Sequence, residues 1–192
     1  MLRRSQFFFL RHGETDWNKE QRAQGQRDVP LNATGLGQAR RARALVADLQ
    51  IVTICASPLR RAMETAGPLR ESLGCELRVV DELAECAWGD REGDIKGQWF
   101  EDWKSGEASP RGAETYEGFL KRALEGINRC LEEPGPVLIV SHGGVYWAVQ
   151  KYAALGPEFD IPNAIPVRHA PPTSSFPWWT ATVLEEGAEP TG

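Results

Sequence analysis

Residues 7–14 read FFFLRHGE, a short apolar run that ends in a charged, glycine-containing turn. A continuous apolar run of this length is typical of a β-strand that is buried on both faces. A second run, PVLIV at residues 136–140, is followed in a similar way by SHGG at residues 141–144. We therefore expect two buried strands, each leading directly into a histidine.

The rest of the chain alternates short apolar runs with helical periodicity. Further strands are predicted over residues 51–56 and 76–80 and, in the tail, over residues 165–167 and 180–184. Apolar residues spaced three and four apart predict helices over residues 35–49, 58–73, 116–131 and 143–155. Thr34 or Asn32 would cap the first helix, and Pro58 would lie in the first turn of the second. Buried strands alternating with helices predict an α/β fold, a three-layer sandwich with a mostly parallel central sheet flanked by helices.

The length of 192 residues is typical of one domain, which we expect to span residues 1–192. One segment interrupts the alternation. Residues 85–113 hold Trp88, Trp99 and Trp103 among many glycines and charged residues. We interpret about residues 86–112 as a partly helical insertion over the edge of the sheet and over the active site, where Trp88 and Trp99 would flank a substrate or simply pack. The last residues, 185–192, look like a frayed tail.

Charge and composition exclude several classes of partner. The net charge is −5, from 22 basic and 27 acidic residues, and there is no long basic run. We therefore expect neither nucleic acid nor an anionic membrane as a partner. No apolar run approaches the roughly 20 residues of a membrane span, and residues 7–10 are too few for the apolar core of a signal peptide. Four scattered cysteines without a C-x-x-C pair are typical of reduced thiols in a cytoplasmic protein.

Two of the three histidines occupy the same kind of position. His12 follows the first predicted strand and His142 follows the strand at residues 136–140. Ligands of parallel α/β sheets bind beyond the carboxyl ends of the strands, so both histidines are candidates for one site. The alternative is that each caps a helix or fills a loop. His169 lies among Arg168 and two prolines, and we expect it in a loop rather than in the pocket.

Five short blocks stand in order between residues 11 and 144. They are RHGET at 11–15 with WN at 17–18, QGQRDVPLN at 24–32 with TG at 34–35, SPLRRA at 57–62 with TA at 65–66, LAE at 83–85 with Gly89 and EG at 92–93, and VSHGG at 140–144. Together they resemble the signature of the histidine phosphatase superfamily, the phosphoglycerate mutase-like proteins. The resemblance covers about residues 7–150 and implies a phosphoglycerate mutase-like fold and phosphomonoester chemistry.

The resemblance assigns three catalytic residues. His12 attacks phosphorus and becomes a phosphohistidine, His142 adds a donor opposite it, and Glu85 is the general acid that later activates water. A carboxyl in this role must hold its proton near neutrality, and the apolar neighbours of Glu85 favour the neutral form. Asp81 and Glu82 are rival carboxylates that do not fit the block. Another branch of the superfamily has an Asp after the second histidine, where this chain has Gly143.

The resemblance also implies a set of phosphate-binding residues. Arg11 and Arg61 would clamp the phosphoryl oxygens, because a guanidinium fork fits two of them at once. The remaining contacts are expected from Asn18, His142 and the backbone N–H of Gly143, which opens the next helix. Arg60 and Arg27 are interpreted as surface charges and Glu14 as structural. Asn18 would alternatively cap a turn.

Other chemistries fit less well. Ile139 replaces the first glycine of the serine hydrolase pattern Gly-x-Ser-x-Gly around Ser141. The chain has no P-loop, no Gly-x-Gly-x-x-Gly fingerprint and no zinc-ligand spacing, so we expect no metal and no cofactor.

The predicted function is a metal-independent phosphatase acting on a small phosphorylated metabolite. One alternative is a 2,3-bisphosphoglycerate-dependent phosphoglycerate mutase. Such mutases resemble this chain but carry an Arg-Arg pair for the substrate carboxylate, where this chain offers only Lys96, Lys104 and an isolated Arg111. A second alternative is a non-catalytic, phosphate-binding regulatory protein. Phosphoprotein substrates and a homodimer stay open.

Overall fold

The centre of the molecule is a β-sheet, seen here in a computed structural model that describes residues 1–156 and 161–185. Within these residues the sheet has six strands in the order β3-β2-β4-β1-β5-β6. The strands are β1 (Phe7–Arg11), β2 (Thr53–Ala56), β3 (Glu76–Val79), β4 (Val137–Ser141), β5 (Pro166–Ala170) and β6 (Thr180–Val183). The first four are parallel to one another, whereas β5 pairs antiparallel with both β1 and β6. The prediction of a mostly parallel sheet is confirmed.

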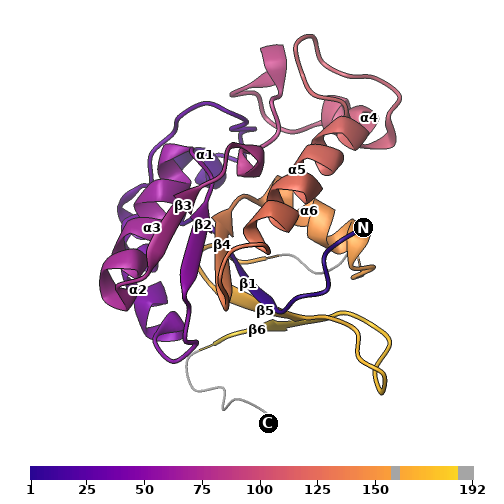
Figure 1. Ribbon diagram of the computed structural model, residues 1–192. Coiled ribbons are helices and arrows are strands. Elements are labelled where there is room, and N and C mark those ends of the chain that lie inside the picture. The colour runs from indigo at the N-terminus through magenta and orange to yellow at the C-terminus, as the bar shows by residue number, and fades with distance from the viewer. Residues whose placement is uncertain (157–160, 186–192) are drawn as a thin grey trace.

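Helices cover both faces of this sheet, as Figure 1 shows. On one side lie α2 (Ala33–Val46) and α3 (Arg60–Leu73), and on the other lie α5 (Tyr116–Cys130) and α6 (Gly143–Tyr152). Two short helices, α1 (Asp16–Lys19) and α4 (Gln98–Ser105), lie at one end of the molecule. The three-layer sandwich expected from the sequence is confirmed.

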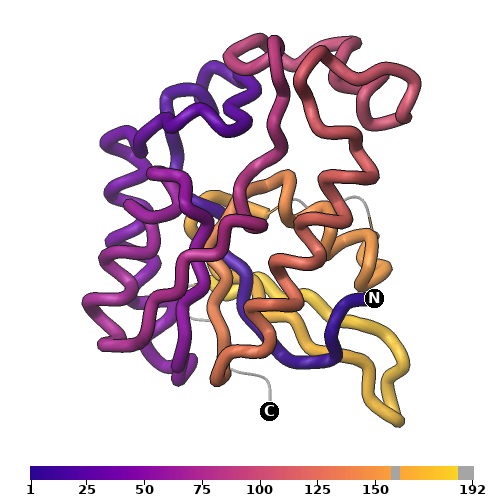
Figure 2. Tube along the Cα trace, turned by 45° about the horizontal axis from the view of Figure 1, so that its top comes forward, coloured from indigo at the N-terminus to yellow at the C-terminus, as the bar shows by residue number. Residues whose placement is uncertain are grey.

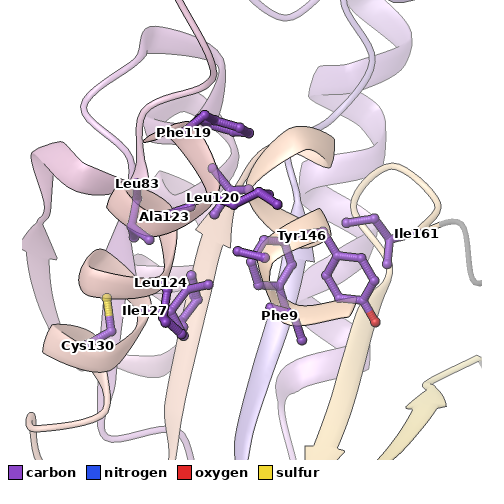
Figure 3. Packing of buried hydrophobic residues seen from close by; sticks show 14 of the residues in the cluster. Phe9, Leu83, Phe119, Leu120, Ala123, Leu124, Ile127, Cys130, Tyr146 and Ile161 are labelled. Carbon is purple, nitrogen blue, oxygen red and sulfur yellow. The ribbon is translucent and has the colours of Figure 1, made fainter. Parts of the chain in front are cut away.

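The apolar runs supply side chains to both faces because successive residues of a strand point in opposite directions. Phe7 and Phe9 of β1 pack into the cluster under α5 and α6, whereas Phe8 and Leu10 pack into the cluster under α2 and α3. Figure 3 shows Phe9 between the side chains of α5 and Tyr146 of α6. The central strands are therefore buried on both sides.

Some boundaries differ from those predicted. Asn32, not Thr34, caps α2, and its side chain accepts from the N–H of Gly35. Helix α3 begins at Arg60, so Pro58 lies before the helix and not in its first turn. The hydroxyl of Ser57 accepts from the N–H of Leu59, which keeps this junction extended up to the helix cap. β3 forms one edge of the sheet and is largely exposed.

The segment predicted as an insertion, residues 86–112, is partly helical and holds α4 together with a 3₁₀ turn at Gly89–Arg91. Its aromatic side chains pack tightly, with the rings of Trp88 and Trp103 4.4 Å apart and Trp147 of α6 beside Phe100. In Figure 2 this segment runs across the same end of the molecule as the chain around α1. The N–H of Ala23 donates to the carbonyl of Asp94, and this hydrogen bond joins residues 86–112 to the chain that follows α1.

The expectation that His169 lies in a loop is wrong. This residue belongs to β5, pairs with Phe7 of β1 and is fully buried, with its ring stacked on the Phe7 ring at 4.6 Å. The phenol of Tyr146 satisfies its Nε2 at 2.9 Å. The strand therefore continues past Val167, the last residue of the predicted run.

The four cysteines are free thiols. No helix in the described residues combines the length and the apolar character that a bilayer span requires. Most of the predicted frayed tail, residues 186–192, lies outside the described part of the chain.

Candidate active site

The two histidines lie side by side at the carboxyl edge of the sheet. β1 and β4 are parallel neighbours with Arg11 opposite Ser141, and the N–H of His12 donates to the carbonyl of Ser141 at 2.9 Å. The imidazole centroids of His12 and His142 are 5.2 Å apart. Residues that are 130 positions apart in the sequence thus share one site, as their positions after the two strands predict.

A cavity of about 260 Å³ opens beside this pair. Its walls contain most of the predicted site residues, namely Arg11, His12, Asn18, Arg61, Glu85 and Gly143. His142 is fully buried next to His12 and does not form part of the cavity wall. The remaining lining residues are Arg22, Gln24, Trp88, Lys96, Gly144 and Trp147.

His12 is held in one tautomer. Its Nδ1 lies 2.7 Å from the carbonyl of Gly13, and because a carbonyl can only accept, Nδ1 must carry the proton. Burial, and then the positive charges of Arg61 and Arg11, hold the pKa of His12 well below its ordinary value. At neutral pH the ring is therefore uncharged, with the lone pair on Nε2.

The two predicted clamp arginines are fixed by backbone carbonyls. Arg61 is completely buried and donates to the carbonyls of Gly25 at 2.8 Å and Arg27 at 2.9 Å. Burial lowers the pKa of Arg61 to about 10, which leaves it cationic at neutral pH. Arg11 donates from Nη1 to the carbonyl of Ile161. Among the described residues the Nε atoms of Arg11 and Arg61 are buried and have no hydrogen-bond partner, so each has a donor available for an anion in the cavity.

His142 is oriented by Ser57, a contact that the sequence reasoning missed. The Ser57 hydroxyl lies 2.7 Å from Nε2 of His142, whereas Nδ1 of His142 is buried without a protein partner. Burial, and next the charge of Arg61, keep the pKa of His142 well below its ordinary value. If Ser57 donates to Nε2, the neutral ring carries its proton on Nδ1 as a further donor.

Glu85 is anchored at the cavity by two backbone groups. Its Oε1 accepts from the N–H of Cys86 at 2.9 Å, and its Oε2 accepts from the N–H of Gly144 at 3.1 Å. The approach is so close that a Cβ at position 144 would lie 2.1 Å from Oε1. A side chain at this point of α6 would therefore displace the Glu85 carboxylate, and the predicted acid and the second histidine block are in direct contact.

Arg122 of α5 supports the loop that carries Glu85. Its guanidinium donates to the carbonyls of Glu82, Ala84 and Glu85 and pairs with Glu114 at 2.6 Å. In the sequence Arg122 is one of two arginines in the predicted helix at residues 116–131 and lies beside its apolar face, which gives no local signal for this role.

The remaining predicted residues have mixed outcomes. Asn18 lines the cavity, and its Oδ1 accepts from the N–H of Thr15 in a reciprocal cap of α1. Its contact with a phosphate stays a prediction. Gly143 opens α6 beside the Arg11 guanidinium. Arg60 is exposed and pairs with Glu64, and Arg27 is exposed and pairs with Glu92.

Several lining residues had no assigned role in the sequence reasoning. Arg22 and Gln24 lie within or beside the second block, and Trp147 stands four residues after Gly143, on the same face of α6. Lys96 appeared only as a substitute for the missing arginine pair. In the described residues no three His, Cys, Asp or Glu side chains gather as a set of metal ligands.

The fold and the cavity define an α/β protein with a pocket lined by cationic side chains, beside paired histidines, at the carboxyl edge of its sheet. The sequence profile of the histidine phosphatase superfamily (branch 1) matches residues 7–174. The chain therefore belongs to the histidine phosphatase superfamily.

Its relatives include phosphatases and mutases. The chain is 37% identical over 145 residues to the uncharacterized phosphatase PhoE of Bacillus subtilis, covering 73% of this chain and 72% of the relative. It is 34% identical over 149 residues to the probable phosphoglycerate mutase GpmB of Salmonella choleraesuis, covering 72% of this chain and 69% of the relative. Among solved structures, a mycobacterial glucosyl-3-phosphoglycerate phosphatase in complex with VO3 superimposes with a TM-score of 0.76 at 28% sequence identity. The superposition covers 93% of this chain and 97% of that chain.

Proposed function

We propose that the chain is a metal-independent phosphatase that hydrolyses small phosphorylated metabolites through a phosphohistidine on His12. One observation carries the proposal. The bare Nε2 of a neutral, buried imidazole shares a single cavity with one fully buried guanidinium group, one partly buried guanidinium group and one anchored carboxyl group. A nucleophile, an anion clamp and an acid are the parts that phosphomonoester hydrolysis needs.

In the first step, Nε2 of His12 attacks phosphorus and the bond from phosphorus to the alcohol oxygen breaks. Glu85 gives its proton to that oxygen, so the alcohol leaves neutral. Negative charge on the three phosphoryl oxygens is balanced by Arg11, Arg61 and the N–H of Gly143. We assign His142 as a further donor, because its Nδ1 has no partner among the described residues although the ring is buried behind the cavity wall, next to His12. Asn18 contributes a further polar contact to the phosphoryl group.

In the second step, water attacks the phosphohistidine. The Glu85 carboxylate takes a proton from the water, the phosphorus–nitrogen bond breaks, and inorganic phosphate leaves with His12 restored. Positive charge in the cavity comes from guanidinium groups that are fixed by backbone carbonyls, so the mechanism requires no divalent cation.

The cavity supports a small substrate that has a second polar or anionic group. Its volume of about 260 Å³ suits a metabolite. Beyond the phosphate clamps its lining includes Lys96 and Arg22, the latter paired with Glu20 at 2.6 Å. The structural relative named as a glucosyl-3-phosphoglycerate phosphatase acts on a phosphate ester that also has a carboxylate. We propose phosphorylated sugar acids and related metabolites as the first compounds to try.

A mutase is the second candidate, favoured by the 34% identity to the probable mutase GpmB. The likeness to the phosphatase PhoE, at 37%, and the lack of an Arg-Arg pair in residues 93–112 favour the hydrolase.

The test is a panel of phosphomonoesters that includes 3-phosphoglycerate, with and without EDTA. We expect inorganic phosphate to be released at the same rate in both conditions. Isomerised phosphoglycerate without phosphate release would identify a mutase. Activity that is lost in EDTA and restored by Mg²⁺ would contradict metal independence, and binding of phosphate without turnover of any ester would favour the regulatory alternative.

A further inference from the structure

The peptide group that follows the nucleophile is held at both of its edges by distant side chains. The carbonyl of His12 accepts from Nδ2 of Asn163 at 2.7 Å, and the N–H of Gly13 donates to Oγ1 of Thr65 at 2.9 Å. These two backbone groups belong to one planar unit, the peptide bond between His12 and Gly13. Asn163 stands 151 positions after His12, just before β5, and Thr65 stands in α3.

The Thr65 hydroxyl has a second partner. It lies 2.7 Å from the carbonyl of Arg61, to which it must donate because a carbonyl only accepts. A hydroxyl has one proton and two lone pairs, so Thr65 can donate to Arg61 and accept from Gly13 at once. Thr65 is completely buried, so its hydroxyl has no contact with solvent. The nucleophile loop is thus tied to the helical turn that carries the clamp Arg61.

This anchoring matters because the group that sets the tautomer of His12 is a backbone carbonyl of glycine, the most flexible residue type. Nδ1 of His12 donates to the carbonyl of Gly13. Glycine is required at position 13, because a Cβ there would lie 2.6 Å from the carbonyl oxygen of Gly35. Glycine on its own leaves its backbone dihedral angles free. The Gly13 carbonyl belongs to the next peptide unit, and the N–H of that unit, from Glu14, donates to Oε1 of Gln38 at 2.7 Å. With the far side of Gly13 held in this way, the distance from Nδ1 of His12 to the Gly13 carbonyl depends on how firmly the peptide between His12 and Gly13 is held.

We propose that Thr65 and Asn163 are positioning residues that fix the peptide bond between His12 and Gly13, and so hold His12 with its proton on Nδ1 and its lone pair on Nε2. Neither side chain lines the cavity, so each acts through His12 and not on the substrate. The kinetic consequences of this inference rest on the proposed function, whereas the effect on the imidazole does not.

The first test compares Thr65→Val with Thr65→Ser. Valine has nearly the same shape but lacks the hydroxyl, whereas serine keeps it. For Thr65→Val we expect kcat on p-nitrophenyl phosphate to fall by about 10- to 100-fold, the effect of displacing a reacting group by a fraction of an ångström to an ångström. The inhibition constant of inorganic phosphate should stay within about threefold, because the guanidinium clamps remain. Thr65→Ser should regain most of the lost kcat.

The second test observes the imidazole directly. The ¹⁵N shifts of the His12 ring should show a single tautomer protonated on Nδ1 in the unaltered protein and a mixture of tautomers in Thr65→Val. Asn163→Ala, at a partly exposed position, should have the same effect and supplies the test if Thr65→Val does not fold. Because both side chains hold one peptide, the double variant should lose less activity than the product of the two single losses.

Three results would overturn the inference. The first is an unchanged tautomer in both variants. The second is a loss in Thr65→Ser as large as in Thr65→Val, which would indicate packing and not the hydroxyl. The third is a phosphate affinity that falls in step with kcat, which would indicate general distortion of the site. If the protein hydrolyses no phosphomonoester, the ¹⁵N shifts of the His12 ring still test the inference. A mixture of tautomers in the variants supports it, and a single tautomer in the variants contradicts it.

Discussion

Substituting Gly144 by alanine tests whether Glu85 acts as the acid without changing Glu85 itself. The added Cβ would lie 2.1 Å from Oε1 of Glu85, whereas ordinary contacts begin near 3.4 Å. The carboxylate must therefore move by about 1 Å, and its hydrogen bond from the N–H of Gly144 must lengthen or break. Oε1 is the far end of a flexible side chain, so the fold should accommodate the change.

The expected loss follows from this displacement. A 1 Å misplacement of a reacting group costs about 10²-fold in rate, and general acid catalysis as a whole contributes about 10²–10⁴-fold. We therefore expect Gly144→Ala to lower kcat by about 10²-fold on an alkyl phosphate, whose alkoxide needs a proton to leave. The loss should be clearly smaller on p-nitrophenyl phosphate, whose phenolate leaves without one.

The assay measures phosphate release from both esters by the same protein preparation. Gly67→Ala in α3 is the matched control, because a Cβ there meets no atom within 4 Å, and it should leave both rates unchanged. Equal losses on the two esters, or no loss on the alkyl ester, would refute the argument that Glu85 is the proton donor and that Gly144 is needed to hold it.

Three further predictions concern the acid, the clamp and one buried histidine. Glu85→Gln should lower kcat by about 10²–10⁴-fold on alkyl phosphates and by much less on the aryl ester. Equal losses of kcat on the two esters would direct the search for the acid to Asp81 or Glu82. Arg61→Ala should lose activity on both esters alike, because charge on the phosphoryl oxygens develops whatever the leaving group, so a loss confined to alkyl esters would count against the clamp. Burial lowers the pKa of His169 to about 4, so between that value and its ordinary 6.5 the unfolded chain binds a proton that the folded chain excludes. The stability associated with neutral His169 is therefore fully present above pH 6.5 and is lost as the pH falls toward 4. By pH 5 this amounts to about 2 kcal/mol, and His169→Gln should reduce the drop in the free energy of unfolding between pH 7 and 5 by that amount in urea titrations. An unchanged drop would mean that other groups cause the acid sensitivity.

The parts of the site that the sequence could predict depend on local pattern. The strands before His12 and His142 are apolar throughout, and parallel strands end at a common edge, so the meeting of the two histidines follows from the pattern alone. The sequence also predicts which of the two adjacent arginines faces the cavity, because Arg61 is inside and lines it whereas Arg60 is on the surface. In each case the sequence pattern that predicts where a side chain lies is found within a few residues of that side chain.

The parts that could not be predicted depend on partners far away in the sequence. His169 is buried because Phe7 stacks on it and Tyr146 satisfies its Nε2, and neither partner is visible from the prolines and Arg168 that surround it. Asn163 has no local pattern, since its role arises from one hydrogen bond across 151 positions. Gly144 was counted only as part of a block, because its contact with Glu85 exists only once α6 and the acid loop are packed together.

The measurement that tests the central claim most directly is mass spectrometry of the protein quenched during turnover of a phosphomonoester. The account predicts one added phosphoryl group, stable in alkali and lost in acid, located on His12 and missing from His12→Ala, which should also have no measurable turnover. A phosphoryl group on any other residue, or sustained turnover by His12→Ala, would contradict it.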